Sequence, residues 1–244
     1  MKYLTNQQLK RQLVGFRRRI SFMVLKLIAG FMIISILLVL PFRWLDPSFS
    51  MVMVDRYWQL SHDEVIYHQW RDWSAIPPHA VLAVVAAEDQ AFLSHAGFDF
   101  SSIWRAVKAG IAGEKLRGAS TISQQVARNM YLWTGRSWLR KGLEVWFTLL
   151  IELFWGKQRI LEVYLNIAEW GRGVFGIAAA SQFHFKQDIQ QLSSDKIALL
   201  AVSLPNPIHY QPAKPSAYLL QRARWNRQQQ KSLGGIQWLA DIYQ

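Results

Sequence analysis

The segment 77-PPHAVLAVVAAEDQAFLSHAGFDF-100 joins a long apolar run to two adjacent carboxylates, Glu88 and Asp89. Proline is tolerated in a first helical turn, so the two prolines predict a helix start, and the apolar residues after them predict a buried helix. Glu88 is therefore expected at the edge of a surface of apolar side chains that excludes water. Desolvation there raises the pKa of a carboxyl and suits it to proton transfer near neutral pH. A solvated helix cap or a salt-bridge partner would explain the same acids without chemistry.

The N-terminus has the pattern of a membrane anchor. Residues 1–19 carry six Lys or Arg and no acid, and residues 20–42 are apolar except for Lys26. About 20 apolar residues span a bilayer, and the stem of Lys26 can carry its charge to the headgroups. A cleaved signal peptide is the alternative, but 43-RWLDPSFS-50 has no small-x-small cleavage site. We expect a cytoplasmic basic tail over 1–19, a transmembrane anchor over 20–42, and the rest outside the cytoplasmic membrane.

Length and charge narrow the function classes. Residues 43–244 are enough for one domain and too few for two of ordinary size. Seven of the 28 Lys and Arg precede residue 43 and none of the 16 acids does, so the outer part has a net charge of +5. This mildly basic domain suits anionic headgroups or a phosphorylated substrate and argues against nucleic acid. The chain has no Cys, so we expect no disulfide.

The outer domain is predicted to be mainly α, and no convincing alternating strand pattern is found. Thr121 and Gln124 fit a capping box at the start of one helix, and residues 43–76 are expected to be a connector or partial helix. Short Gly or Pro breaks separate the expected helices, which cover residues 99–112, 120–132, 137–155, 158–170, 176–184, 195–203 and the stretch from 215 onward.

A second acid lies in 140-RKGLEVWFTLLIE-152. Glu144 follows Arg140 by four residues and Lys141 by three, so the three side chains share one helix face with an apolar surround. A structural ion pair explains that face equally well. A functional role for Glu144 is favoured by other features of the same chain: Glu88, a Gly-Ala-Ser-Thr turn, paired glutamines and scattered basic residues.

Five segments resemble, in order and spacing, the motifs of the peptidoglycan glycosyltransferases that polymerise lipid II. These segments are 88-EDQAFLSHAGFD-99, 118-GASTISQQVARNMYL-132, 140-RKGLE-144, 160-ILEVYLNIAEWG-171 and 176-GIAAAS-181. The resemblance covers about residues 75–210 and implies a lysozyme-like glycosyltransferase fold, which agrees with the helical prediction. It implies polymerisation of lipid II into β-1,4-linked glycan strands in cell wall biosynthesis. It also implies an inner-membrane anchor with a periplasmic catalytic domain.

The resemblance gives the two acids different roles. Glu88 is implied to be the general base that takes the proton from the C4 hydroxyl of the acceptor sugar, while undecaprenyl diphosphate is released with inversion. Arg128, Arg136 and Lys141 match positions that hold the diphosphate. Glu144 is implied to orient this basic cluster or a bound divalent cation, Mg or Mn, and no cofactor is implied to be obligatory. Relatives often have Lys at the position of Arg128, and a planar guanidinium does not reproduce a point charge.

Further residues are implied to shape the sugar and phosphate sites: Asp89, Phe92, Arg105, Ser120, Thr121, Gln124 and Gln125. Phe92 could equally be plain core, and Ser120 and Thr121 could be only helix caps. Gln124 and Gln125 are adjacent on a helix and cannot both face one direction, so one of them could be structural.

Two further sequence features are better explained by structural roles than by functional ones. No second His, Cys or acid stands at metal spacing near His95, so we expect a structural hydrogen bond there rather than a metal site. The segment 193-SSDK-196 matches the S-x-x-K of penicillin-binding transpeptidases, but the chain has no S-D-N or K-T-G partner. We expect Ser194 or Asp195 to cap the helix that follows.

Two other functions stay open at this point. A lytic enzyme of the same general fold would cut glycan strands through one catalytic acid, and the second acid and the diphosphate-matching residues argue against it. A non-enzymatic membrane-anchored scaffold would leave the acids as mere surface. The expected partners are lipid II, the growing glycan strand and membrane lipid, with cell-wall synthesis or division proteins as further candidates.

Overall fold

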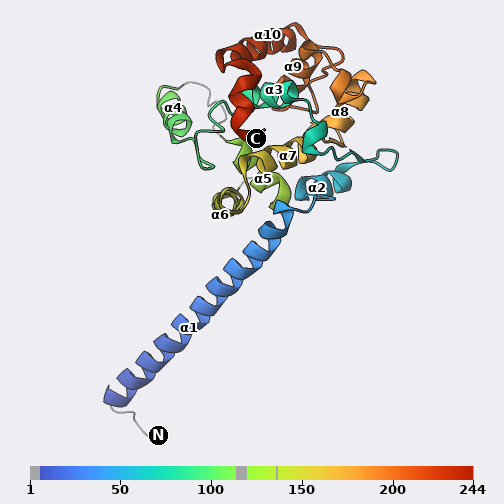
Figure 1. Ribbon diagram of the computed structural model, residues 1–244. Helices are drawn as coiled ribbons and strands as arrows, with labels where there is room; N and C mark the ends of the chain where they lie inside the picture. The colour runs from blue at the N-terminus through green and yellow to red at the C-terminus, as the bar shows by residue number, and fades with distance from the viewer. Residues whose placement is uncertain (1–5, 114–119, 136, 244) are drawn as a thin grey trace.

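The computed structural model describes residues 6–113, 120–135 and 137–243. One long helix, α1 (Asn6–Val39), projects from a mostly helical body (Figure 1). The stretch Gly15–Arg43, which includes the short turn η1 (Leu40–Arg43), is long and apolar enough to cross a membrane. Most of its apolar side chains are exposed, as expected for a helix solvated by lipid. The helix is consistent with a single-pass membrane anchor.

The body confirms the mainly α prediction. Its longer helices are α2 (Met51–Gln59), α3 (Pro78–Glu88), α4 (Phe100–Ile111), α5 (Ile122–Tyr131), α6 (Trp138–Phe154), α7 (Lys157–Ile167), α8 (Ile177–Phe185), α9 (Ser194–Ser203) and α10 (Ala217–Ser232). Its shorter 3-10 segments are η2 (Trp73–Ala75), η3 (Ile189–Gln191) and η4 (Gly235–Ile242).

The apolar helix α3 lies at the centre of the body. Its residues from Ala80 to Ala86 are all buried, as expected of a helix that is hydrophobic on every side. It packs against α9, α10 and η4, while α5 packs against α6 and α7 (Figure 1). Glu88 is the last residue of α3 and therefore emerges where these two groups of helices meet.

The predicted cap is found at α5 and is displaced by one residue at α9. Thr121 and Gln124 form the predicted capping box: Thr121 Oγ1 accepts from the Gln124 amide at 3.2 Å, and Gln124 Oε1 accepts from the Thr121 amide at 3.1 Å. At α9 the prediction was wrong by one residue. Ser193 has extended backbone angles and caps the helix, because Ser194 already lies in its first turn. Lys196 binds Gln187 Oε1 at 2.6 Å, so the S-x-x-K spacing has a structural explanation.

A small sheet corrects the prediction of a body without strands. β1 (Tyr67–His68) pairs in parallel with β3 (Val174–Phe175), which pairs antiparallel with β2 (Glu169–Gly171). Strands of two or three residues are too short to show an alternating pattern. The helix expected to reach residue 170 ends at Ile167 because the chain enters β2, and the segment expected as a connector contains α2 and β1.

The anchor helix is fixed to the body through α6 and the residues that follow it. Trp146 Nε1 donates to Ser35 Oγ, and Trp155 Nε1 donates to the Val39 carbonyl, both at 3.0 Å. Arg159 binds the carbonyl oxygens of Phe42 and Leu45 at 2.9 and 2.6 Å. The last turns of the anchor are therefore part of the packed body.

Candidate active site

Glu88 is the centre of the candidate site. It is partly buried at the end of α3, and its Oε2 accepts a hydrogen bond from Gln125 Nε2 at 2.8 Å. Its Oε1 is buried and has no hydrogen-bond partner among the described residues. Burial is the largest influence and raises the pKa of Glu88, whereas the Gln125 hydrogen bond and the Arg128 charge lower it. Glu88 thus lies at the end of a buried apolar helix, as predicted, and its pKa is shifted in the predicted direction.

Three cavities that share lining residues form one groove past Glu88. The first, of about 230 Å³, lies between Glu88 and α4 and includes Arg105 and Ser120. The second, of about 600 Å³, extends from Glu88 to Arg128. The third, of about 460 Å³, begins at Gln125 and Arg128 and continues along α2 and α6. A carboxylate able to take a proton thus stands at one junction of the groove and a guanidinium at the other.

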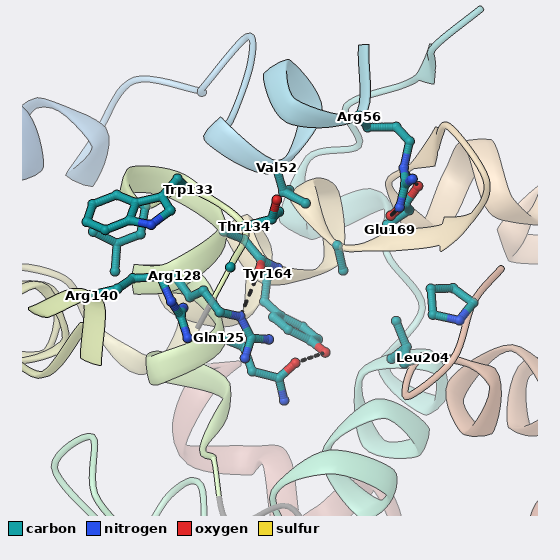
Figure 2. A pocket seen from close by; sticks show the side chains of 15 residues that line it. Val52, Arg56, Gln125, Arg128, Trp133, Thr134, Arg140, Tyr164, Glu169 and Leu204 are labelled. Carbon is teal, nitrogen blue, oxygen red and sulfur yellow. Dashed lines mark hydrogen bonds and ion pairs between the residues drawn. The ribbon is translucent and has the colours of Figure 1, made fainter. Parts of the chain in front are cut away.

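The third cavity is lined by basic and aromatic side chains (Figure 2). Arg128 and Arg140 point into it from α5 and α6, with Trp133 beside them. On its far side Arg56 is held by Glu169 through two hydrogen bonds of 2.7 and 2.9 Å, so the charge of that arginine is already neutralised. Arg128 has no carboxylate partner among the described residues, and Arg140 shares the single carboxylate of Glu144 with Lys141, so these two arginines are the cations best placed for an anionic ligand here.

Asp89 lines the first cavity and organises the start of α5. Its buried carboxylate accepts from the Ile122 amide at 2.9 Å and lies 3.0 Å from His95 Nε2. A carboxylate at a helix N-terminus satisfies an otherwise free N–H and interacts favourably with the helix dipole. His95 Nδ1 in turn accepts from the Gly97 amide at 3.1 Å. The structural role predicted for His95 is confirmed, and Asp89 ties Glu88 to α5.

Phe92 and Gln124, both expected on the cleft, are held below its surface, whereas Thr121 is buried but lines the first cavity. Phe92 is fully buried, with the Lys157 ammonium 4.5 Å from its ring centre, so the expected cleft position is corrected to core. Thr121 and Gln124 are buried in the capping box, and Thr121 Oγ1 also donates to the Gly97 carbonyl at 2.7 Å. Gln125 is the glutamine that faces the groove, in agreement with the prediction that one of the pair is structural.

Glu144 does not line the groove. It is 1% exposed, accepts from Lys141 Nζ at 2.5 Å, and lies 3.4 Å from Arg140 Nη1. Of these three residues, only Arg140 lines any of the three cavities among the residues described. Glu144 therefore lies behind Arg140 and contacts the two cations that it was expected to orient, and its part in catalysis stays a prediction. Arg136, expected at the diphosphate, lies outside the described residues.

The carboxylates of the site do not gather into a cluster typical of a metal centre. Among the residues described, no three His, Cys, Asp or Glu side chains come together in a way that could hold a metal ion. The carboxylate of Glu144 already has two cationic partners, so a metal ion there would have to displace one of them.

Two further contributions to the groove were not predicted. Tyr164 of α7 lines the third cavity beneath Gln125, although no site role was predicted for this residue. The C-terminal part of the chain closes the second cavity with Tyr210, Tyr218, Arg222 and Trp225. Arg222 stacks over Trp225, 4.1 Å from its ring centre. The basic character of α10 was the one available signal for its part in the groove.

The chain resembles known proteins over most of its length. Residues 57–231 match the family described as Transglycosylase. The chain is 49% identical over 226 residues to the biosynthetic peptidoglycan transglycosylase of Chromohalobacter salexigens, covering 91% of this chain and 96% of that protein. Proteins of the same description from Stutzerimonas stutzeri and Pseudomonas aeruginosa are both 50% identical. These two alignments cover 92% and 88% of this chain, and 92% and 94% of the relatives.

Proposed function

Because the chain belongs to the transglycosylase family and is a peptidoglycan glycosyltransferase, we propose that it polymerises lipid II with Glu88 as the general base. The observation that carries this assignment is the carboxylate itself. Glu88 has one oxygen held by Gln125 and the other without a partner among the described residues, and it borders two cavities of the groove. A base has to lie within hydrogen-bond reach of the proton it removes, and the position of Glu88 on the groove supports this role.

The proposed reaction balances without any further reactant. The C4 hydroxyl oxygen of the acceptor sugar attacks the anomeric carbon of the growing chain. The bond from that carbon to the phosphate oxygen breaks, and undecaprenyl diphosphate leaves with the electron pair. Glu88 takes the hydroxyl proton, and an α-linked donor yields a β-1,4 link. The raised pKa of Glu88 suits this step because a base works best when its pKa lies near the operating pH.

The leaving diphosphate is proposed to lie along the arginine side of the groove. Diphosphate is a good leaving group that needs its charge neutralised more than it needs a strong acid, and fixed cations supply this. Arg128 and Arg140 line the third cavity, while Lys141 and Arg136 are assigned to the diphosphate by resemblance. Glu144 is proposed to act through Arg140 and Lys141. No cofactor is proposed as obligatory, and a divalent cation, Mg or Mn, would enter with the diphosphate.

The membrane placement of the enzyme is also a proposal. The helix α1 and the basic residues before it support a single crossing of the inner membrane with the N-terminus in the cytoplasm. The groove would then face the periplasm, where it meets lipid II, the growing strand and membrane lipid. An anchored enzyme and a lipid-linked substrate share a two-dimensional phase, which raises their effective concentration.

Polymerisation by the Glu88→Gln variant tests the assignment. Full-length protein in detergent micelles is given lipid II, and strand formation is followed by product length. The variant keeps the size of the side chain but cannot accept the proton, so the rate should fall about 10²- to 10⁴-fold. Near-normal turnover with a normal melting temperature would reject Glu88 as the base. Finished sacculus serves as the parallel substrate, and its cleavage would instead support the lytic alternative.

A further inference from the structure

A chain of hydrogen bonds connects the buried side chain of Tyr164 to Glu88. The Tyr164 hydroxyl donates to Gln125 Oε1 at 3.1 Å (Figure 2), and Gln125 Nε2 donates to Glu88 Oε2 at 2.8 Å. These three residues come from α7, α5 and α3. Tyr164 borders the third cavity but is only 1% exposed, and its hydroxyl is engaged by Gln125.

The chemistry of the chain fixes the orientation of the Gln125 amide. Its carbonyl oxygen faces a hydroxyl donor, and its NH₂ group faces a carboxylate, which in its ionised form can only accept hydrogen bonds. Turning the amide over would place its oxygen against the Glu88 carboxylate and bring two acceptors together. The Tyr164 hydroxyl therefore favours the orientation in which Gln125 donates to Glu88.

We propose that Tyr164 is a positioning residue for glycosyl transfer: through Gln125 it holds Glu88 Oε2 and thereby fixes the orientation of the carboxylate that receives the proton of the acceptor sugar. This inference rests on the proposed role of Glu88 as the general base. The relay assigns Tyr164 no contact with substrate, so its loss should change turnover more than substrate binding.

The relay also affects the protonation of Glu88. The Gln125 hydrogen bond lowers the pKa of Glu88 against the larger effect of burial, so a loosened amide would let that pKa rise further. Tyr164 keeps its proton throughout, because burial raises its own pKa well above the usual value. The charged groups that act on Glu88 from neighbouring elements are Asp89, Arg128 and Arg222. The other titratable groups that line its two cavities are Asp99, Arg105, Tyr210 and Tyr218.

The test is the pH dependence of lipid II polymerisation by full-length Tyr164→Phe. At neutral pH the kcat should fall about two- to tenfold, the range that one ordinary hydrogen bond is worth, with KM unchanged. A base works in its ionised form, so a raised pKa of Glu88 should move the acid limb of the profile to higher pH. The rate should recover toward the wild-type plateau at alkaline pH. A purely structural defect would lower the rate equally at every pH.

Tyr131→Phe is the matched control. This tyrosine lies on α5, and its hydroxyl is also buried but has no hydrogen-bond partner in the part of the chain that the structure describes. Its variant loses the same atom and should keep the wild-type profile. Melting temperatures of both variants report any loss of fold.

A double-variant cycle with Gln125→Met tests whether Tyr164 acts through the amide. The single Gln125→Met variant should shift the acid limb at least as far as Tyr164→Phe, and adding Tyr164→Phe to it should shift the limb no further. Additive shifts, or a Tyr164→Phe profile equal to wild type, would overturn the relay. If Glu88→Gln remains active, the base assignment fails first. An inactive Glu88→Gln beside an unshifted Tyr164→Phe rejects the relay alone.

Discussion

Glu144 lies 3.4 Å from the guanidinium of Arg140 and one helical turn behind it, shielded from the groove that Arg140 enters. The same carboxylate accepts from Lys141 at 2.5 Å, so a single buried acid holds two cations of one helix face. Removing one partner of a buried ion pair commonly costs more than the pair contributes, because a charge is left uncompensated. Lys141 is 44% exposed, which leaves Arg140 as the partner that depends most on Glu144.

Glu144→Gln should therefore slow the chemical step more than it weakens the binding of a phosphoglycolipid that resembles the donor. The static contacts of Arg128 and Arg140 survive, while the arrangement that neutralises the developing diphosphate charge is loosened. Arg140→Ala should reduce rate and affinity together, since this side chain lines the groove. Single-turnover rates and inhibitor affinity at fixed salt make the comparison. Equal proportional losses in both variants would leave Glu144 as an ion-pair partner only.

Arg128 should tolerate replacement by lysine but not by alanine. It lines two cavities of the groove and lowers the pKa of Glu88 by its charge. Arg128→Lys keeps that charge and should stay within about tenfold of the wild-type rate, whereas Arg128→Ala should lose about 10²-fold or more. Arg128→Ala should also move the acid limb of the pH profile upward.

Arg227→Ala is the control for this pair, because Arg227 is a half-exposed arginine on α10 paired with Asp195. Steady-state lipid II polymerisation at constant ionic strength measures all three variants. A lysine variant as slow as the alanine variant would show that the polymerisation rate depends on the planar geometry of the guanidinium rather than on its charge.

Local sequence patterns predicted the parts of this structure that depend on near neighbours. The apolar run of α3 and the Thr-x-x-Gln box of α5 each specify a helix within a few residues, and both are found. The pairing of β1 with β3 joins residues more than 100 positions apart, as Tyr67 does with Val174. Two residues carry no periodic signal for such a contact.

In the candidate site, too, the features that depend on contacts between distant parts of the chain were not predicted. A motif resemblance identified Glu88 and Arg128 by position but carried no information about depth, so Phe92 was expected on the cleft and is found in the core. The relay from Tyr164 crosses 39 residues to Gln125 and 37 more to Glu88. Only packing brings those three side chains together, and a tyrosine in an apolar helix pattern is more often core than part of a site.

The junction of anchor and body should limit how far the N-terminus can be shortened. Deleting residues 1–30 leaves the contacts of Ser35 and Val39, whereas deleting residues 1–42 removes the fully buried Val39 and the acceptor of the Trp155 indole. The longer deletion should lower stability by about 2 to 5 kcal/mol, from lost apolar burial and an unpaired buried donor. Thermal unfolding in one detergent compares the two. Equal melting temperatures would mean that the anchor contributes nothing to the fold.

Glu88→Gln should raise stability while it removes activity, and the gain should grow with pH. Burial raises the pKa of Glu88 in the folded protein above its usual 4.5, so between these two values the native state binds more protons than the unfolded chain. Stability contributed by the protonated carboxyl is therefore lost as pH rises through this window.

Glutamine in place of Glu88 is neutral at every pH and avoids that loss. We expect a gain of about 0.5 to 2 kcal/mol at neutral pH, the usual range for a single stabilising substitution, and none well below pH 4.5. Melting curves from about pH 3 to pH 8, a range that brackets the reference pKa, measure the difference. Asp195→Asn, at a carboxylate 74% exposed, is the control that removes an acid without removing a buried charge. A gain independent of pH would trace the effect to packing and would contradict a buried, reluctantly ionised Glu88.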